Sequence, residues 1–404
     1  MERRKNPNDK FGFVETVKEL LKNIAVIGAG QGAPQGKENY CDEGIPFIKA
    51  GNLQELIEGK NINFIQKVSE GVVRKYKLKK YPKGTILFAK SGMSCMKGYV
   101  YVLPQEACVV SHLACITPKL EVSDYLRYYF LFNKPNTLVK DVSYPSISLQ
   151  DIGELKISIK TDLERNKIVG TLKCIENNIS MRKNELRKYD ELIKARFIEM
   201  FGDPEINQMG WAKRPLSSVI VNANNGMTRR GNDKDGNIVM RLVELQDGYI
   251  DYSNPNRITL QDSEKKRYLL KDKDFLFARV NGNPNNVGRC AVFHDIGEDV
   301  YHNDHIIRVH FNELMLNGTF ASVLFNSDYG KQQLRGQIKT SAGQYTVSQD
   351  GIGAIIAIMP PIELQNQFAD FVKQIDKSKL AVQQSLEKTQ LLFDSLMQEY
   401  FGEN

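Results

Sequence analysis

The chain has 404 residues, of which 41% are hydrophobic and 25% are charged, with a net charge of +7. This composition is typical of a soluble globular protein of two to four domains, and no stretch of about 18 uncharged apolar residues could form a transmembrane span. The N-terminal MERRKNPNDK lacks the apolar core of a secretory signal, and the six cysteines form no C-x-x-C pair. We therefore expect a cytoplasmic protein with reduced thiols, without disulfides or a zinc site. The basic excess is compatible with a polyanionic partner.

Residues 24–34, IAVIGAGQGAP, match the pattern G-x-G-x-x-A of dinucleotide-binding proteins. That pattern holds a pyrophosphate only where a strand leads into a helix, because the phosphates bind the free N–H groups of the helix N-terminus. The segment from Pro34 to Pro46 holds two prolines and two glycines and shows no helical apolar spacing. We therefore predict a glycine-rich turn beside a strand. A nucleotide-dependent oxidoreductase built on the Gly28–Gly32 loop is kept as an alternative.

The second half of the chain repeats the first. Phe201-Gly202 and Phe401-Gly402 stand 200 positions apart, and the same spacing links residues from Ser148 and Ser348 onwards without a gap. Earlier blocks align with offsets of 192, 189 and 193, namely FIKAGNL (47–53) with VMRLVEL (239–245), TILFAK (85–90) with DFLFAR (274–279), and VSHLACI (110–116) with NDHIIRV (303–309). The chain is therefore a tandem duplication, in which a globular half is followed by a more constant segment.

Each constant segment predicts a long helix, over residues 163–200 and 364–400. Thr161 and Glu164 form a capping box that starts the first helix, Pro360-Pro361 can start the second, and Gly202 and Gly402 stand at the ends. Apolar residues then recur in alternating steps of four and three, which is typical of a coiled coil. The predicted seam consists of Ile168, Leu172, Ile175, Ile179, Leu186, Ile193, Phe368, Val372, Ile375, Val382, Leu386, Phe393 and Leu396.

A helix of about 38 residues is about 57 Å long. We expect the two copies to pair in antiparallel fashion around a pseudo-twofold axis and to fix the distance between two globular units. Such a spacer suits a periodic ligand such as DNA, whose successive sites on one face lie about 34–36 Å apart. The alternative is that each helix packs only on its own globular half.

The segment ARFIEMFGDPEINQMGW (195–211) resembles the junction between the two halves of specificity (S) subunits of type I restriction-modification systems. The resemblance extends over essentially the whole chain and includes the duplication, the long helices, GIPFIKAGNL (44–53) and PSISLQDIGEL (145–155). In that family the first domain begins with an apolar strand and a G-x-T-P-like turn. Here the turn is Gly30 to Pro34, with Ala33 in place of the usual threonine.

The resemblance implies an α+β fold, with two mixed α/β target recognition domains separated by two long antiparallel coiled-coil helices. The implied boundaries are a first recognition domain at 1–152, a first spacer helix at 153–203, a second recognition domain at 204–352 and a second spacer helix at 353–404. The resemblance further implies a non-catalytic subunit that reads a bipartite sequence in double-stranded DNA, docks two methyltransferase (M) subunits and joins restriction/translocase (R) subunits. S-adenosylmethionine, ATP and Mg would then bind the partners. A coiled-coil adaptor that binds only protein is the other alternative.

No catalytic, cofactor or metal residue is assigned in this chain. The sequence has no G-x-x-x-x-G-K-[ST] loop, and its only Pro-Pro pair precedes the second helix instead of forming an [N/D]-P-P-[Y/F] loop. Asp141 with Glu154-Leu155-Lys156 resembles a D…E-x-K nuclease motif, but the second copy replaces the triplet with Ala354-Ile355-Ile356. A histidine-rich stretch suggests a metal, yet His305 aligns with His112, which has no histidine neighbours, and a structural role is favoured. The stretch holds His294, His302, Asp304, His305 and His310.

Binding to DNA needs Lys and Arg for phosphates, and Arg, Lys, Asn or Gln for base edges. Loops that follow the matching LFA strands, together with the loop at 224–230, carry these residue types and differ between the halves. The candidates are Lys90, Ser91, Lys97, Arg229, Arg230, Arg279, Asn281, Asn283, Asn285 and Arg289. Ordinary turn chemistry explains the same Asn and Gly residues equally simply. The segment 74–83, with six basic residues in ten, could bind phosphate or form a solvated surface.

Overall fold

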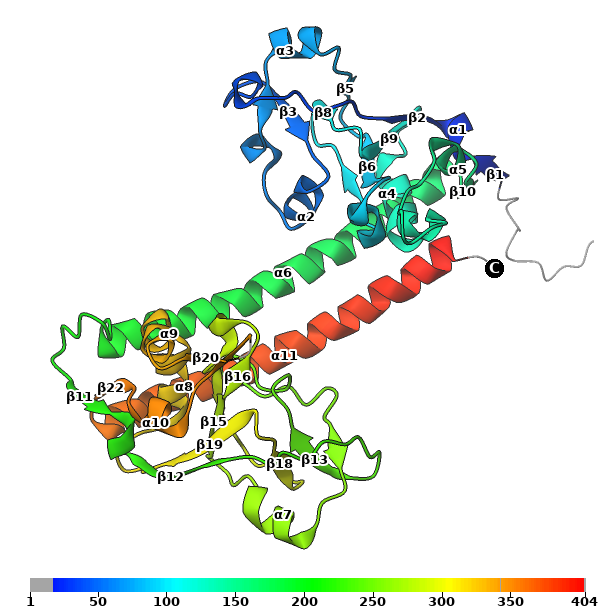
Figure 1. Ribbon diagram of the computed structural model, residues 1–404. Helices are drawn as coiled ribbons and strands as arrows, with labels where there is room; N and C mark the ends of the chain where they lie inside the picture. Colours follow the sequence, from blue (N-terminus) through cyan, green and yellow to red (C-terminus); the bar gives the residue numbers. More distant parts are fainter. Residues whose placement is uncertain (1–16, 342, 403–404) are drawn as a thin grey trace, which may run out of the picture. The chain divides into compact units, whose positions relative to one another are not determined.

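The computed structural model describes residues 17–341 and 343–402 (Figure 1). The chain forms two compact units. The first unit comprises the residues up to Met181 together with 386–404, and the second unit runs from Arg182 to Ser385. Within the described ranges, no helix is both long enough and apolar enough to cross a membrane. The units divide the long helices near their midpoints, so the repeat boundaries expected at 152, 203 and 352 stay a prediction.

The globular part of the first unit contains two small sheets. Their strand orders are β2-β9-β6-β7 and β4-β3-β8-β5, and a two-stranded sheet β1-β10 lies beside them. The strands are β1 (Val17–Leu20), β2 (Ala25–Ala29), β3 (Ile45–Ile48), β4 (Lys67–Val68), β5 (Lys80–Tyr81), β6 (Ile86–Ala89), β7 (Tyr101–Val102), β8 (Ala107–Val109), β9 (Leu113–Pro118) and β10 (Lys156–Ile159). The helices are α1 (Leu21–Ile24), η1 (Lys37–Asn39), α2 (Asn52–Ile57), η2 (Ile62–Phe64), α3 (Glu70–Lys75), η3 (Met93–Lys97), α4 (Ser123–Phe132), η4 (Pro135–Leu138) and α5 (Leu149–Gly153).

The second unit repeats this arrangement. Its sheets β12-β19-β15-β17, β14-β13-β18 and β11-β22 correspond to β2-β9-β6-β7, β4-β3-β8 and β1-β10, and β16-β21-β20 is an additional sheet. The strands are β11 (Ala212–Pro215), β12 (Ile220–Asn225), β13 (Asn237–Met240), β14 (Arg257–Ile258), β15 (Phe275–Ala278), β16 (Val280–Asn281), β17 (Cys290–Val292), β18 (Val300–His302), β19 (Ile306–Phe311), β20 (Lys339–Ser341), β21 (Gln344–Thr346) and β22 (Ile356–Met359). The helices are η5 (Leu216–Ser218), α7 (Asp262–Tyr268), η6 (Pro284–Asn286), α8 (Gly318–Asn326), α9 (Asp328–Arg335) and α10 (Gln349–Gly353). The predicted duplication is confirmed.

The two long helices are α6 (Asp162–Phe201) and α11 (Ile362–Phe401), each of 40 residues. The predicted capping box is present, because the Thr161 N–H donates to Glu164 Oε2 at 3.0 Å and the Glu164 N–H donates to Thr161 Oγ1 at 3.4 Å. Gly202 ends α6 with a φ of +73°, a conformation that favours glycine. Every residue of the predicted seam is buried or half-buried.

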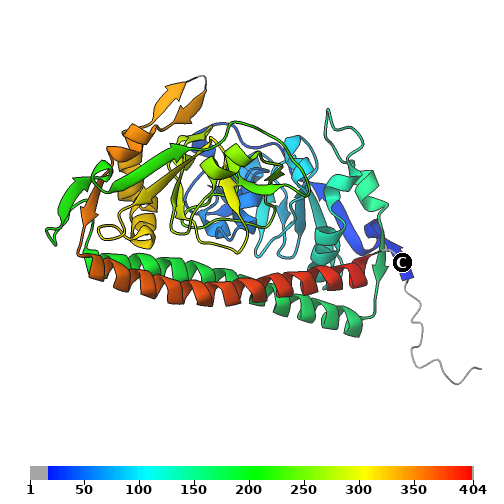
Figure 2. The same cartoon turned by 90° about the horizontal axis from the view of Figure 1, so that it is seen from below.

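The two helices pack against each other in both units, in opposite directions (Figure 2). In the first unit, Leu172 near the start of α6 shares a core with Phe401 at the end of α11. In the second unit, Phe368 near the start of α11 packs against Phe201 at the end of α6, with ring centroids 5.5 Å apart. The antiparallel prediction is therefore confirmed. In each unit the paired segments of α6 and α11 also pack on the globular domain. The alternative that each helix packs only on its own globular half is wrong, because the two helices contact each other.

The glycine motif at 28–33 serves strand packing. No crossover helix follows β2, as predicted, because the next helical element is the short η1. A Cβ at Gly30 would overlap the carbonyl oxygen of Val109, and a Cβ at Gly226, the equivalent residue of the second copy, would overlap that of Asn303. Gly32 meets nothing within 4 Å. The motif thus contains one glycine that a close backbone approach requires.

Replacing Gly30 by alanine is expected to destabilise the protein by about 1–3 kcal/mol, because the added methyl group forces two backbone segments apart. Gly32→Ala is the matched control, since it lies in the same motif with open space around it. Thermal unfolding followed by circular dichroism measures both variants. Equal midpoints for the two variants would contradict this assignment.

Candidate functional site

A histidine-containing turn joins the two main sheets of each domain. In the first unit it connects β8 to β9, and the Leu113 N–H donates to the Val110 carbonyl at 3.0 Å. In the second unit it connects β18 to β19, and the Ile306 N–H donates to the Asn303 carbonyl at 3.0 Å. These hydrogen bonds define β-turns that carry His112 and His305 at matching positions. The sequence alignment of the two histidines is therefore confirmed.

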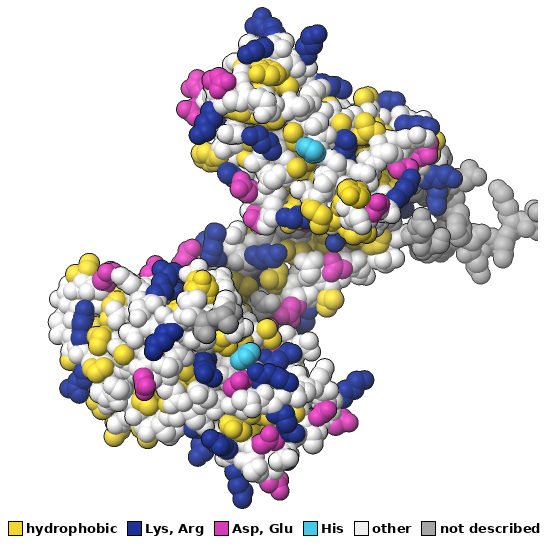
Figure 3. Space-filling model, in the orientation of Figure 1, with side chains coloured by type: hydrophobic (Ala, Val, Ile, Leu, Met, Phe, Trp, Pro, Cys, Tyr) yellow, Lys and Arg dark blue, Asp and Glu magenta, His cyan; other side chains and the backbone are white. Residues whose placement is uncertain are grey.

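The predicted cations Lys90 and Arg279 stand directly beside these turns. The Lys90 N–H donates to the His112 carbonyl at 2.9 Å, and the Arg279 N–H donates to the His305 carbonyl at 2.7 Å. Both side chains are half-buried at the ends of β6 and β15. The Nη1 of Arg279 also donates to the carbonyl of Asp304 at 3.2 Å. A cation from a strand end and a histidine from a turn are thus held together in each unit, and Figure 3 shows basic side chains beside a histidine on the visible face of each.

The ring of each histidine has a different side-chain partner. Ser91 Oγ lies 2.7 Å from Nδ1 of His112. Nη2 of Arg230 lies 3.2 Å from Nε2 of His305 and 2.6 Å from Oδ1 of Asp304. Four of the predicted residues therefore gather around the two equivalent turns, namely Lys90, Ser91, Arg230 and Arg279.

A pocket of about 510 Å³ adjoins the turn of the second unit. It is lined by Arg229, Arg230, Gly231, Asn232, Val239, Arg241, Leu242, Val243, Asn256, Ile258, Asn303 and His305. Arg229 pairs with Glu264 at 2.7 Å, and Arg241 pairs with Glu244 at 2.5 Å. Three arginines therefore line the pocket, two of them paired with glutamates of the same domain, whereas most of the surface that the pocket exposes is apolar.

The remaining predicted residues make turn and network contacts. Oδ1 of Asn281 accepts from the Asn283 N–H at 2.9 Å, and Oδ1 of Asn283 accepts from the Asn285 N–H at 3.0 Å. Asn285 accepts from Arg335 at 3.0 Å. Lys97 is exposed, and its Nζ lies 3.4 Å from Gln54 Oε1. Binding of DNA by these residues stays a prediction, and the turn contacts agree with the simpler role.

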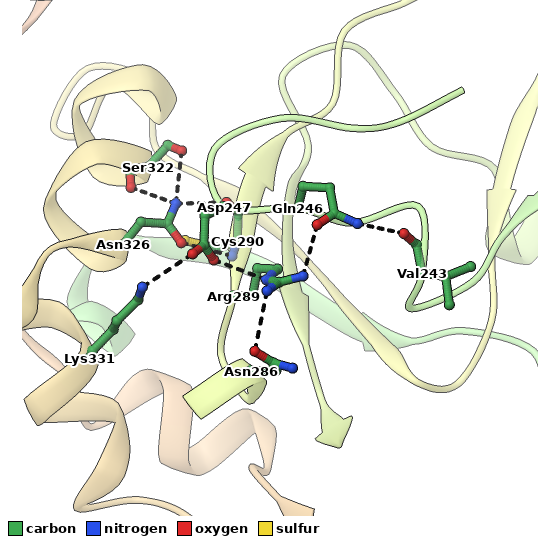
Figure 4. Close-up of polar contacts among 9 residues, drawn as sticks. All are labelled: Val243, Gln246, Asp247, Asn286, Arg289, Cys290, Ser322, Asn326 and Lys331. Carbon is green, nitrogen blue, oxygen red and sulfur yellow. Dashed lines mark hydrogen bonds and ion pairs between the residues drawn. The ribbon is translucent and has the colours of Figure 1, made fainter. Parts of the chain in front are cut away.

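Arg289 lies within a polar network of the second unit (Figure 4). Its guanidinium donates to Asp247 at 3.0 Å, to Gln246 at 2.9 Å and to Asn286 at 3.2 Å. Complete burial raises the pKa of the neighbouring Cys290 well above its ordinary value, so this thiol stays protonated. These contacts assign Arg289 a structural role, and its contact with DNA remains a prediction.

The basic segment 74–83 begins in the last turn of α3 and includes β5, and its lysines lie at the surface, whereas Leu78 and Tyr81 are buried. Lys80 pairs with Glu70 at 2.5 Å and with Glu106 at 3.6 Å. Lys79 lies over the ring of Tyr81, with Nζ 4.9 Å from the centroid. The segment is thus partly neutralised, and its two interpretations remain open.

The histidine-rich stretch is spread over separate sites. His302 is fully buried, with Nδ1 3.1 Å from the carbonyl of Tyr268. His310 lies 3.1 Å from the buried Asp274. Among the described residues, no three His, Cys, Asp or Glu side chains form a group that could hold a metal ion. Asp141 accepts from the Ser143 N–H at 2.8 Å, which is a turn contact.

The sequence analysis does not include His112 and His305 among the candidate DNA contacts, because it considers histidine only as a metal ligand or a structural residue. The available signal was the repetition of a histidine directly before a buried strand in both copies. The contact between Arg230 and Asp304 has no such signal, because the two residues are separated by 74 positions.

Comparison with known proteins places these features in context. Residues 15–188 match the family model described as the type I restriction modification DNA specificity domain. The specificity subunit of the type I restriction enzyme StySPI from Salmonella potsdam is 24% identical over 389 residues, which cover 90% of this chain and 83% of that protein. The EcoKI specificity subunit from Escherichia coli K12 is 21% identical over 390 residues, with the same coverage of both chains.

Solved structures support the fold. The crystal structure of the type I restriction-modification S subunit from M. genitalium superposes with a TM-score of 0.58 and 14% identity, covering 98% of both chains. A chain from a structural study of assembly and conformational transition of the type I R-M system superposes with a TM-score of 0.53 and 13% identity, covering 95% of this chain and 97% of that one.

Proposed function

Because this chain is a specificity subunit of a type I restriction-modification system, we propose that each of its two target recognition domains reads one half of a bipartite sequence in double-stranded DNA. The observation that carries this proposal is the pair of equivalent strand-end clusters, Lys90 with His112 and Arg279 with His305. The two clusters share the backbone hydrogen bond and the histidine, whereas the cation and the partner of the imidazole ring differ. Different side chains on the same scaffold suit two half-sites of different sequence.

Lys90 and Arg279 are the leading candidates for contact with DNA. Both directly follow a strand and are half-buried beside a turn whose histidine is exposed in the first unit and half-buried in the second. Arg and Lys contact guanine in the major groove and also bind phosphates. Arg279 has two terminal nitrogens. Nη1 donates to the carbonyl of Asp304, and within the described part of the chain Nη2 has no hydrogen-bond partner, which leaves Nη2 available for DNA.

The long helices are proposed to set the spacing of the half-sites and to dock two methyltransferase subunits. Leu192 and Leu392 stand 200 positions apart and are 46% and 51% exposed, one in the second unit and one in the first. A repeated exposed leucine supplies equivalent apolar contacts for two copies of one partner. In this proposal the restriction/translocase subunits join the same cytoplasmic complex. The methylation and cleavage activities, with S-adenosylmethionine, ATP and Mg, belong to those partners.

Replacing Leu392 by lysine is expected to remove one of the two methyltransferase subunits, because a charge would be buried in an apolar contact. Native mass spectrometry of the assembled complex measures the stoichiometry. Leu391→Lys is the matched control, since Leu391 is 70% exposed but its counterpart in the repeat is Glu191. A complex that keeps both subunits with Leu392→Lys would contradict the docking proposal.

The function is tested by mapping methylated bases in the DNA of cells that carry this chain with its methyltransferase partners. The expected result is one bipartite motif with a spacer of fixed length. Binding of the purified complex to that motif should weaken steeply with salt, because contacts to phosphates release counterions.

If no methylated motif is found and DNA binding does not depend on salt, the alternative of an adaptor that binds only protein is favoured. The alternative of a nucleotide-dependent oxidoreductase rests on the glycine motif at 28–33. The close approach of the Gly30 backbone to the Val109 carbonyl gives that motif a packing role instead.

Replacing Arg279 by alanine is expected to weaken binding to the cognate sequence by about 1–3 kcal/mol and to relax one position of the second half-site. Competition binding with single-base variants of the mapped motif measures this change. Lys90→Ala is the matched control in the first unit and should act on the first half-site. An equal loss on every sequence would make Arg279 a phosphate contact instead.

A further inference from the structure

The contacts of Arg230 fix the proton position on His305. A guanidinium has only donors, so Nε2 of His305, at 3.2 Å from Arg230 Nη2, must accept a hydrogen bond. A ring nitrogen that accepts carries no proton, and the neutral imidazole therefore carries its proton on Nδ1. Nη2 of Arg230 is itself held by Asp304 at 2.6 Å. His305 lines the pocket of about 510 Å³, and this tautomer makes Nδ1 the only donor of its ring.

Arg230 itself is poorly suited to contact a base. Its Nη1 donates to the carbonyl of Thr228 at 2.8 Å and of Met227 at 3.4 Å, and its Nη2 is used by Asp304 and His305. Both terminal nitrogens are therefore engaged inside the domain. This arrangement makes Arg230 a positioning residue for the imidazole.

The equivalent histidine of the first unit is held differently. Nδ1 of His112 lies 2.7 Å from Ser91 Oγ, so Nε2 is the nitrogen left for a ligand. A hydroxyl can donate or accept, and the proton on His112 can therefore occupy either ring nitrogen. The first copy accepts two tautomers at this position, whereas the second copy selects one.

We propose that His305 and His112 contact bases of the second and first half-site, and that His305 acts as a fixed donor which disfavours cytosine. In the major groove, cytosine offers only its N4 amino donor, whereas guanine, adenine and thymine each offer an acceptor. A donor held at Nδ1 can pair with any of those three acceptors but meets another donor at cytosine. The inference depends on the proposed recognition of DNA by each domain and specifies residues within it.

The test is selection of bound duplexes from a library randomised across the mapped motif, using the full chain assembled with its methyltransferase subunits. For the unmodified chain, cytosine should be depleted about tenfold at one position of the second half-site, since one direct base contact changes affinity by about that factor. His305→Ala should abolish this depletion and leave the first half-site unchanged. His112→Ala should alter one position of the first half-site only.

Variants of Arg230 distinguish positioning from packing. Arg230→Met removes the donor to Nε2 and should restore binding of cytosine at the same position as His305→Ala. Arg230→Lys keeps a donor and should retain the depletion. Fluorescence of Trp211, the single tryptophan of the chain, reports whether each variant is folded.

Unchanged base preferences in folded His305→Ala, or a uniform loss on all sequences, would overturn the role of His305. A failure of Arg230→Met to alter the same position would overturn the positioning role of Arg230. If the unmodified complex selects no bipartite motif at all, the proposed function fails, and the inference fails with it. The two failures are therefore distinct.

Discussion

Replacing Phe201 by alanine is expected to lower the free energy of unfolding of the second unit by about 3–5 kcal/mol. Phe201 is fully buried at the end of α6. Its ring centroid lies 5.1 Å from that of Phe197, 4.8 Å from that of Phe320 on α8 and 5.5 Å from that of Phe368 on α11. Removal of this ring leaves a cavity where two long helices and the recognition domain meet.

The sole tryptophan reports on this site. Nε1 of Trp211 donates to the carbonyl of Phe201 at 2.8 Å, so denaturant unfolding followed by tryptophan fluorescence measures the effect at the junction. Ile198→Ala is the matched control, because Ile198 lies on the same helix with 49% of its surface exposed. The control should change stability by less than about 1 kcal/mol. Similar losses for both variants would mean that the helix end is not buried as described.

The same junction exists in the first unit with different residues. Phe401, at the end of α11, has its ring centroid 5.2 Å from that of Tyr125 on α4. Tyr128, on the same helix, donates to Glu176 of α6 at 2.6 Å, and Arg127 forms a bidentate pair with that carboxylate. In each unit, aromatic residues therefore pack the globular domain against the long helices. In the first unit, the ion pair of Arg127 with Glu176 adds a charged contact.

The long helices could be predicted from the sequence because local rules determine them. The capping box at Thr161, the glycine at Gly202 and a repeating apolar seam all act within a few residues. Near the helix ends, Phe197 and Met397 are nearly fully buried although they lie outside the predicted seam. A third element, α8 or α4, packs against the helices there, and a heptad pattern describes the contact of only two helices.

The candidate site was less predictable, since its geometry depends on contacts between distant residues. Lys90 and Arg279 are predictable because they directly follow matching strands, which the repeat reveals. The role of Arg230 depends on Asp304, which lies on another loop. Residue type also predicts Asn283 as a DNA contact, whereas its side chain accepts from the Asn285 N–H in a turn. Asparagine occurs both in turns and at base contacts, so residue type alone does not separate the two roles.

Acidification is expected to destabilise the second unit through His302, by about 3 kcal/mol between pH 6.5 and pH 4. Burial lowers the pKa of His302 from 6.5 to about 4, and the nearby Arg308 acts in the same direction. Its Nδ1–H donates to the Tyr268 carbonyl, and Nε2 is buried without a partner among the described residues. Backbone hydrogen bonds with Tyr268 and Asn224 favour the cation, but burial outweighs them, and the folded protein therefore holds a neutral imidazole.

The sign follows from the two protonation states. Above pH 6.5 His302 is neutral in both the folded and the unfolded chain, and it adds no pH dependence. As the pH falls below 6.5 the unfolded chain binds a proton that the folded chain refuses, so stability declines. The decline is complete once the pH is below about 4, where both states are protonated.

His302→Val is the decisive variant, because the first copy carries Val109 at the equivalent strand position, and both residues are fully buried. Denaturant unfolding at several pH values, followed by Trp211 fluorescence, should give a pH dependence that is smaller by about 3 kcal/mol in the variant. Carboxylates that titrate in the same range contribute equally to both proteins and cancel in the difference. Parallel stability curves for the two proteins would show that the imidazole is protonated in the folded chain without cost, and the buried, unpaired position of His302 would then be wrong.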